Sequence, residues 1–182
     1  RGEIMQVESA ATKDLDENAY FKMISDKTAS LISASTLIGA ITATNDKNKQ
    51  DAMYHFGEKL GAMFQLKDDL LDITGLERDL GKPTMFDLKK NMLTLPLIYI
   101  LSKQGKTKVQ RKRFISKLKY LSRKNKKEEI KTMIVEMGGV KYTENKIIEL
   151  SNSALKDLVV FEDSKYKESL VSAIEFNVNR VK

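Results

Sequence analysis

The segment that most constrains the fold is residues 49–73, which contains no proline and ends in a cluster of aspartates. Its apolar side chains recur at the three- and four-residue spacing of an α-helix. They are Met53, Phe56, Leu60, Met63 and Phe64. These residues supply the apolar side of the predicted helix.

Three carboxylates, Asp68, Asp69 and Asp72, lie near the predicted end of this helix, because Thr74 and Gly75 follow them. Like charges three or four residues apart on a helix repel, and the helix dipole disfavours anions at a C-terminus. A bound Mg²⁺ ion would offset both effects, since it takes one or two carboxylates together with the oxygens of a phosphorylated substrate. The sequence therefore indicates either a metal site or a solvated acidic helix end.

Most of the remaining segments also predict helices, and no alternating strand pattern bounded by hairpin turns is visible. We therefore predict an all-α fold. Residues 2–8 read as the middle or end of a helix, and the chain begins with Arg1 rather than methionine, so we expect the native start to lie upstream. The other predicted helices are residues 17–44, 94–102, 107–122, 126–137, 143–161 and 164–181.

Composition narrows the class of protein. A chain of 182 residues with 41% hydrophobic and 31% charged residues suits one globular domain or a large piece of one. The absence of cysteine excludes disulfides and cysteine-ligated zinc. The longest apolar run, residues 93–101, is far shorter than the roughly 20 residues that a spanning helix needs.

The charge is unevenly distributed. The formal net charge is +7, yet residues 103–131 alone hold 13 Lys and Arg against two Glu, so the rest of the chain is mildly acidic. Such a segment could contact nucleic acid or an anionic membrane surface. Only Phe114 and Tyr120 are aromatic there and no nucleic-acid-binding motif is present, so a solvated helix face is the simpler interpretation.

Three further features bear on function. The first two each have two possible interpretations, and the third has one. Lys27 lies among small residues in the predicted helix 17–44, and it either reaches into a cleft or extends along the surface. The irregular stretch 74–91 carries Lys82 beside Gly81, and it is either a lid over a bound anion or a plain connector. His55 has no ligand partner at helical spacing and is predicted to be an ordinary helix residue.

Five short motifs follow one another along the chain: GEIMQ, DKTASLISAS, GEKLGAMFQLKDDLLD, LGKPTMFDL and TLPLIYIL. Together they resemble the motifs of one family, the trans-isoprenyl diphosphate synthases, also called polyprenyl synthetases. The order and rough spacing of the motifs also match, strongly up to about residue 101 and weakly beyond, over the C-terminal half of the family.

The resemblance implies an all-helical bundle around a deep central cavity, in a cytoplasmic homodimer. It also implies a reaction in which an allylic prenyl diphosphate condenses head to tail with isopentenyl diphosphate. Mg²⁺ and lysines would draw off the allylic diphosphate, the homoallylic double bond would attack the resulting carbocation, and a proton would then be lost. The departing group carries a high negative charge, so this chemistry depends mainly on electrostatic stabilisation of that group.

Site residues follow from the same motifs. The resemblance assigns Mg²⁺ binding to the second aspartate-rich motif: Asp68, Asp69 and Asp72. It assigns contact with the substrates to Gln6, Lys27, Thr28, Gln65 and Lys82, with Glu3 as a weaker match. Among all of these, the catalytic role falls to Asp68, Asp69, Lys27 and Lys82.

Two departures from the family pattern stand out. Many members have Gly/Asn-Lys-x-Thr where this chain reads Asn91-Met92-Leu93-Thr94, so one phosphate-side lysine is absent, which favours a longer-chain or specialised member. The family's first aspartate-rich motif, which lies upstream of GExxQ, has no counterpart in this sequence. We therefore predict that residues 1–182 are the C-terminal part of a single synthase domain and are inactive alone.

Two alternatives remain open. The chain could be a non-catalytic or regulatory subunit of a heteromeric prenyl synthase, although the retained aspartates and lysines favour an enzyme. It could instead be a basic binding module built on residues 103–131. Nucleic acid is not expected as a partner, whereas peripheral contact with a membrane is compatible with an enzyme whose long prenyl products partition into lipid.

Overall fold

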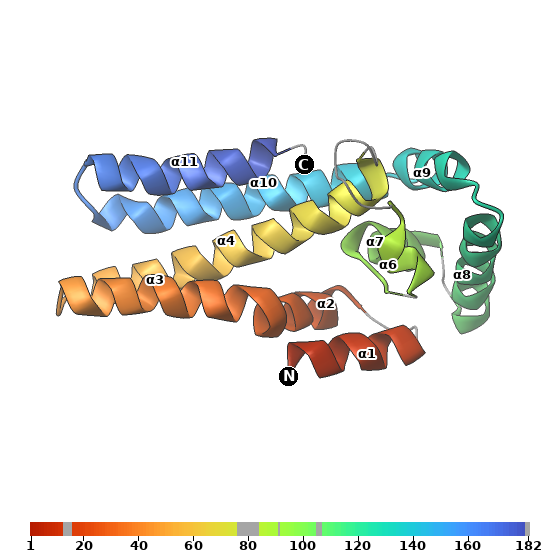
Figure 1. The fold of residues 1–182 in the computed structure, drawn as a ribbon, viewed down its shortest axis with the longest axis horizontal. Helices are drawn as coiled ribbons and strands as arrows, with labels where there is room; N and C mark the ends of the chain where they lie inside the picture. The colour runs from red at the N-terminus through yellow and green to blue at the C-terminus, as the bar shows by residue number, and fades with distance from the viewer. Residues whose placement is uncertain (13–15, 76–83, 91, 105–106, 181–182) are drawn as a thin grey trace. The chain divides into compact units, whose positions relative to one another are not determined.

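The computed structural model describes residues 1–12, 16–75, 84–90, 92–104 and 107–180, and every regular element in this part of the chain is a helix (Figure 1). The all-α prediction is confirmed. The elements are α1 (Gly2–Thr12), α2 (Glu17–Ile24), η1 (Ser25–Ala29), α3 (Ser30–Ala43), α4 (Lys47–Thr74), α6 (Phe86–Lys89), α7 (Leu95–Gln104), α8 (Lys108–Arg123), α9 (Lys127–Glu136), α10 (Gly139–Asp157), η2 (Leu158–Val160) and α11 (Lys165–Asn179).

The chain divides into two compact units. Unit 1 consists of Arg1–Gly2, Phe21–Lys67 and Lys146–Arg180. Unit 2 includes Glu3–Tyr20 and Asp68–Asn145. The divisions fall inside the helices α1, α2, α4 and α10, so each of these helices contributes residues to both units.

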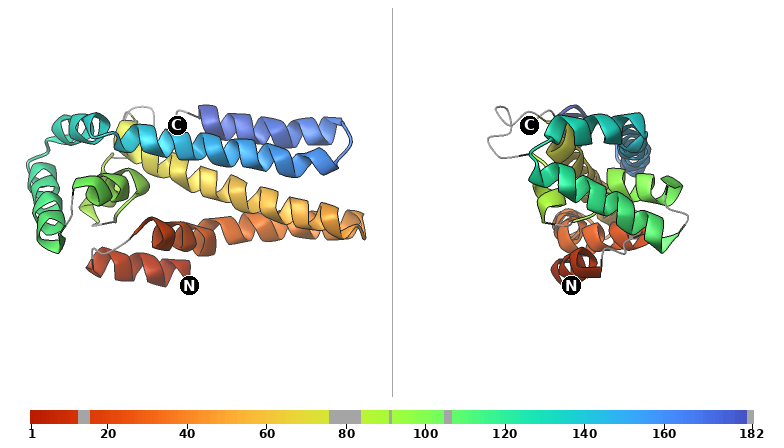
Figure 2. Two further views of the ribbon diagram at one scale, coloured as in Figure 1. Left: turned by 180° about the vertical axis from the view of Figure 1, so that it is seen from behind. Right: turned by 90° about the vertical axis from the view of Figure 1, so that its right-hand side faces the viewer.

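Unit 1 is built from two helical hairpins, α3 with the first part of α4 and the second part of α10 with α11 (Figures 1 and 2). Its core is apolar and closely packed, as the spacing of residues 49–73 predicts. The buried residues at its centre are Phe56, Met63, Ala154, Leu158 and Ile174. The segment Ser164–Lys167 begins α11 with a side-chain cap, in which the Ser164 hydroxyl accepts the Lys167 backbone N–H at 3.2 Å.

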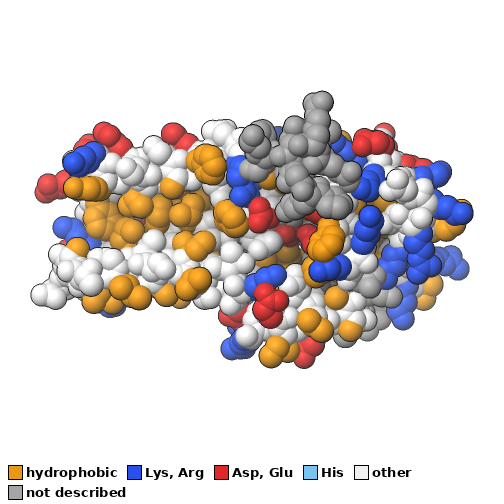
Figure 3. All heavy atoms as spheres, viewed as in Figure 1, with side chains coloured by type: hydrophobic (Ala, Val, Ile, Leu, Met, Phe, Trp, Pro, Cys, Tyr) orange, Lys and Arg blue, Asp and Glu red, His pale blue; other side chains and the backbone are white. Residues whose placement is uncertain are grey.

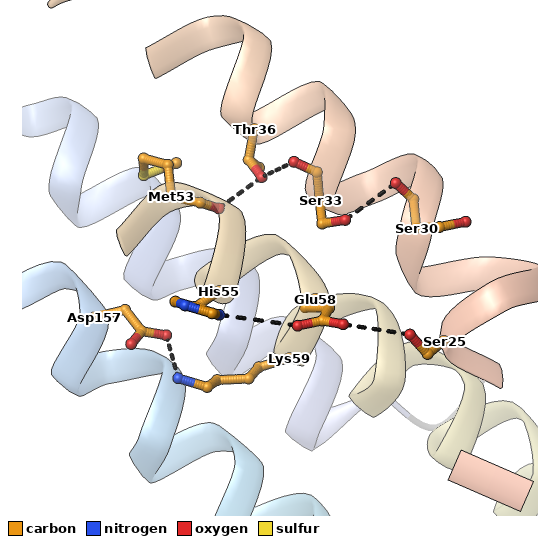
Figure 4. Close-up of polar contacts among 9 residues, drawn as sticks. All are labelled: Ser25, Ser30, Ser33, Thr36, Met53, His55, Glu58, Lys59 and Asp157. Atoms are coloured by element: carbon orange, nitrogen blue, oxygen red, sulfur yellow. Dashed lines mark hydrogen bonds and ion pairs between the residues drawn. The ribbon is translucent and has the colours of Figure 1, made fainter. Parts of the chain in front are cut away.

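The α3–α4 hairpin is unusually close because α4 presents glycines to its neighbour. A Cβ placed on Gly57 would lie 2.7 Å from the Ser33 Cα, closer than real Cβ contacts allow. The Thr36 hydroxyl donates to the Met53 carbonyl of α4 at 2.7 Å (Figure 4). The two backbones therefore meet with almost no side chain between them.

The outer face of α3 is also apolar. Leu31, Ile38 and Ile41 are exposed there, while Ser33 and Ala40 face α4 and are buried. Figure 3 shows hydrophobic side chains gathered along α3 and α10 on one face of unit 1. This surface is more apolar than a solvated helix face requires.

Unit 2 packs α6, α7, α8 and α9 around a second apolar core, which includes Ile73, Ile100, Leu118, Ile130 and Ile134. The basic segment, residues 103–131, includes the end of α7, all of α8 and the first half of α9. Thr107 begins α8 with a capping box that it shares with Gln110. Ile115 and Leu121 are buried beneath the helix, whereas Lys and Arg side chains gather on the outer surface of α8 (Figure 3). The exposed cations Lys112, Arg113 and Lys117 therefore lie on the solvated side of an amphipathic helix, whereas the Lys131 Nζ of α9 donates to the Thr74 carbonyl at 2.9 Å.

Three helix predictions need correction. Residues 17–44 do not form one α-helix, because the π-helical turn η1 separates α2 from α3. The helix predicted for residues 143–161 begins four residues earlier, at Gly139, and ends in the 3₁₀ turn η2. Part of the stretch 74–91, predicted to be irregular, forms the short helix α6. Within the described ranges, no helix combines the length and the apolar character needed to cross a bilayer.

Candidate functional site

The last two turns of α4 carry the three aspartates, and all three belong to unit 2. Asp69 is 4% exposed and Asp72 is 6% exposed, whereas Asp68 is partly exposed. Two of the three carboxylates are therefore out of water, where an ionised group needs donors to offset the loss of hydration. Because they are buried, Asp69 and Asp72 are not simply part of a solvated acidic helix end.

Asp69 receives a strong hydrogen bond from α2. The Tyr20 hydroxyl donates to the Asp69 Oδ2 at 2.6 Å, and Tyr20 itself is 1% exposed. Burial, together with the neighbouring Asp69 carboxylate, holds the pKa of the Tyr20 phenol well above its usual value. The phenol is therefore a permanent donor at neutral pH.

Asp72 is bound by backbone groups from the segment that precedes and begins α6. Its Oδ1 accepts the Phe86 N–H at 3.1 Å and its Oδ2 accepts the Asp87 N–H at 3.3 Å. Its backbone carbonyl also accepts the Met85 N–H at 2.9 Å. Met85 adopts a left-handed backbone conformation with φ of 59°. Asp72 thus fixes the position at which the chain resumes regular structure as α6.

Gln6 lies in unit 2 as well. Its side-chain amide donates to the Met92 sulfur at 3.1 Å. Met92 belongs to the Asn91–Thr94 stretch, in which the family's phosphate-side lysine is absent. Gln6 and Met92 are 86 residues apart in the sequence, so only folding brings them into contact. Glu3, the weaker match, is exposed on α1.

Lys27, Thr28 and Gln65 belong to unit 1. Lys27 and Thr28 lie on the π-helical turn η1, and the Thr28 hydroxyl donates to the Gln65 side-chain oxygen at 3.0 Å. The structure therefore brings together two residues that the motifs assign independently to substrate contact. π-Helical turns inside helices occur frequently at functional sites.

Small residues hold this turn in place. A Cβ on Gly61 of α4 would lie 2.5 Å from the Ala29 Cα, and a Cβ on Gly2 would lie 2.5 Å from the Lys27 backbone nitrogen. Ser25 adds a hydrogen bond from its hydroxyl to Glu58 of α4 at 3.3 Å (Figure 4). The glycines of the GEIMQ and GEKLG motifs are therefore needed for close approach to η1.

Some predictions lie outside these contacts. Lys82 lies outside the residues that the structure describes. His55 is largely exposed and lies 3.9 Å from Glu58 (Figure 4), in agreement with an ordinary helix residue. Among the described residues, no group of three or more His, Asp or Glu is arranged as a preformed metal site. The donors that suit Mg²⁺ by chemistry are the carboxylate oxygens of Asp68, Asp69 and Asp72.

Sequence reasoning missed two features, Tyr20 and the π-helical turn. Tyr20 stands in an ordinary amphipathic helix pattern, and nothing in that pattern indicates that its hydroxyl would reach a carboxylate 49 residues away. The π-helical turn had a partial signal, because Lys27 lies among small residues, and small side chains let a neighbouring helix or a ligand come close.

Comparisons with known proteins identify the family to which this chain belongs. The family model described as Polyprenyl synthetase matches residues 1–137, and the chain belongs to this family. The resemblance read from the motifs is therefore confirmed. The chain is similar to solanesyl diphosphate synthase 1 of Arabidopsis thaliana, with 32% identity over 99% of this chain and 43% of the relative. It is 42% identical to heptaprenyl diphosphate synthase component 2 of Geobacillus stearothermophilus, over 56% of this chain and 32% of the relative.

Solved structures agree with this assignment. The polyprenyl synthase of Caulobacter crescentus, complexed with calcium and isoprenyl diphosphate, matches all of this chain with a TM-score of 0.86 and 27% identity. The heptaprenyl diphosphate synthase of Staphylococcus aureus matches it with a TM-score of 0.85 and 29% identity. The chain covers 55% and 56% of these two structures, and less than half of the curated relatives named above.

Proposed function

We propose that this chain supplies the second aspartate-rich half of a prenyltransferase that extends an allylic prenyl diphosphate with isopentenyl diphosphate and releases diphosphate. The family match over residues 1–137 carries the proposal. It is supported by the calcium and isoprenyl diphosphate named in the Caulobacter crescentus complex. The cytoplasmic location and the homodimer implied by the resemblance stay predictions.

The proposed roles follow the charges of the side chains. Asp68, Asp69 and Asp72 would hold Mg²⁺, which when bound neutralises the departing diphosphate. Lys27 and Lys82 would contribute positive charge to the allylic diphosphate, and Thr28 would donate a hydrogen bond to it. Gln6 and Gln65 would orient the substrates through their amides. None of these side chains is assigned as a proton acceptor, in keeping with loss of the proton to the departing diphosphate.

The direct test is incorporation of labelled isopentenyl diphosphate by the intact protein, with and without Mg²⁺. Asp68→Ala is expected to lower kcat/KM at least about 100-fold, because a group that stabilises developing negative charge is lost. Asp68 suits this test because its carboxylate is partly exposed. Its removal should therefore leave the fold intact.

Asp163→Ala is the matched control, since its carboxylate is 98% exposed on the surface of unit 1. This variant should retain the wild-type rate. If Asp68→Ala also stayed within a few-fold of wild type, the assignment of that carboxylate would be wrong.

A second candidate function is that of one subunit in a two-component synthase. It is favoured by the name of the Geobacillus stearothermophilus relative, which is called component 2. The experiment is to purify the intact protein expressed alone, determine its native mass and assay it. A homo-oligomer that is active by itself would eliminate this candidate, whereas an inactive protein rescued by a second polypeptide would support it.

A further inference from the structure

Tyr20 stands out among the buried polar groups of unit 2 because its hydroxyl meets a predicted metal ligand. The phenol is 1% exposed, and its oxygen lies 2.6 Å from the Asp69 Oδ2. That distance lies within the range of about 2.5–2.7 Å that is typical of a hydroxyl that donates to a carboxylate. None of the five sequence motifs includes Tyr20, which lies seven residues before Lys27.

The geometry has a consequence for Asp69. A buried carboxylate can rotate about its side-chain torsions unless donors define one orientation, and Tyr20 supplies such a donor from a rigid ring in α2. A phenol held in an apolar core has little freedom, so the direction of its O–H bond is well defined. Outer-shell donors of this kind fix the orientation of the ligands that contact a metal.

We propose that Tyr20 is a positioning residue, whose hydroxyl holds the Asp69 carboxylate in the orientation that binds the divalent cation. This inference rests on the proposed metal-binding role of Asp69. It assigns a function to a residue on α2, which the aspartate-rich motif of α4 does not contain. Tyr20 acts through Asp69 and does not itself contact the cation or the substrate.

The test is Mn²⁺ binding to the intact protein, followed by electron paramagnetic resonance of the free ion. Tyr20→Phe removes one oxygen and keeps the ring, and it is expected to weaken Mn²⁺ binding roughly 10- to 100-fold. In steady-state assays, the Mg²⁺ concentration for half-maximal rate should rise by a similar factor. The kcat at saturating Mg²⁺ should recover to within a few-fold of wild type, and a purely structural defect would not produce this split.

Tyr142→Phe is the matched control. The Tyr142 hydroxyl also donates to a carboxylate in unit 2, with distances of 2.8 Å to both oxygens of Glu17. Loss of this hydroxyl removes a similar hydrogen bond away from the aspartates, so Mn²⁺ affinity should not change. An equal loss of affinity in both variants would show a general structural effect and would overturn the proposal.

Asp69→Asn separates failure of this inference from failure of the proposed function. If Asp69→Asn leaves Mn²⁺ binding unchanged, the metal-binding role of Asp69 is wrong. If Asp69→Asn weakens binding but Tyr20→Phe remains within twofold of wild type, only the positioning role is wrong. In the double variant, Tyr20→Phe should add little to the effect of Asp69→Asn, because both act through one carboxylate.

A measurement on otherwise unaltered protein covers the case in which Tyr20→Phe does not fold. With 3-fluorotyrosine introduced at position 20, the ¹⁹F resonance should shift as Mg²⁺ is added, since the acceptor of the hydrogen bond changes its charge environment. A resonance that stays unchanged at saturating Mg²⁺ would contradict the proposal.

Discussion

The predicted site residues of unit 1 and unit 2 are held in position by different physical means. In unit 1, the turn that carries Lys27 and Thr28 is fixed by close backbone packing against Gly61. In unit 2, Asp69 and Asp72 are fixed by hydrogen-bond donors. The difference follows from charge and burial. Packing of small residues can place a backbone turn without any charge compensation, whereas a buried carboxylate is stable only with donors around it.

The largest effect is expected when the close packing of unit 1 is disrupted. Gly61→Ala places a Cβ 2.5 Å from the Ala29 Cα, and backbone atoms cannot move aside as a flexible side chain can. We expect the free energy of unfolding to fall by about 3 kcal/mol, at the upper end of the usual cost of overpacking. Urea denaturation of the intact protein measures this change.

Gly39→Ala is the control for that experiment, because a Cβ at Gly39 has no atom within 4 Å. Since alanine is the better helix former, this variant should be neutral or stabilised by up to about 1 kcal/mol. Equal destabilisation by both substitutions would mean that helix propensity, rather than the contact between α4 and η1, explains the result.

A smaller loss is expected when the donors of unit 2 lose their acceptor. Asp72→Ala leaves the Phe86 and Asp87 N–H groups without this carboxylate and should cost about 2 kcal/mol. Hydrogen exchange at these two amides should become faster, while the amides in the middle of α9 change little. Unchanged exchange at Phe86 and Asp87 would show that Asp72 does not anchor α6.

The ionisation of Tyr20 gives a prediction for alkaline pH. The pKa of this phenol is raised in the folded protein well above its usual value, first by burial and then by Asp69. Above pH 10 the unfolded chain therefore releases a proton that the folded protein retains, and stability falls as pH rises. The contribution of Tyr20 to this slope is about 1.4 kcal/mol per pH unit. Tyr20→Phe should remove that part of the slope between pH 10 and the folded-state pKa.

The smallest effect on stability is expected on α8, where neither close packing nor a buried acceptor is involved. Replacing Lys112, Arg113 and Lys117 together by glutamine should change the free energy of unfolding by no more than about 0.5 kcal/mol. Retention on anionic vesicles should fall, because each Lys or Arg near the membrane surface contributes about 1 kcal/mol to the free energy of binding. Unchanged retention would remove the proposed membrane contact of residues 103–131.

Ile115→Ala, on the buried side of the same helix, is the control for the charge substitutions. It should lower stability by about 3 kcal/mol, because it leaves a cavity in the core of unit 2. Vesicle retention of the folded variant should stay at the wild-type level. The two results together would separate the charged surface of α8 from its structural role.

Much of the fold could be predicted from local sequence alone. Helical spacing located both ends of α4, α8, α9 and α11 to within two residues, because caps such as Thr107 and Ser164 act on their own helix. The motifs identified the family because five of them occur together in a fixed order. The prediction failed at η1, since a π-helical turn depends on what packs against it and has little propensity of its own.

The sequence by itself determined the class of fold, the family and the kinds of side chain available for chemistry, because these depend on residue type and spacing. Only the tertiary structure decided which of those side chains are buried and what they contact. Asp68, Asp69 and Asp72 look alike in the motif, yet Tyr20 meets one of them and the backbone of α6 meets another. These partners come from distant parts of the chain, and their positions depend on the packing of the cores rather than on any local pattern.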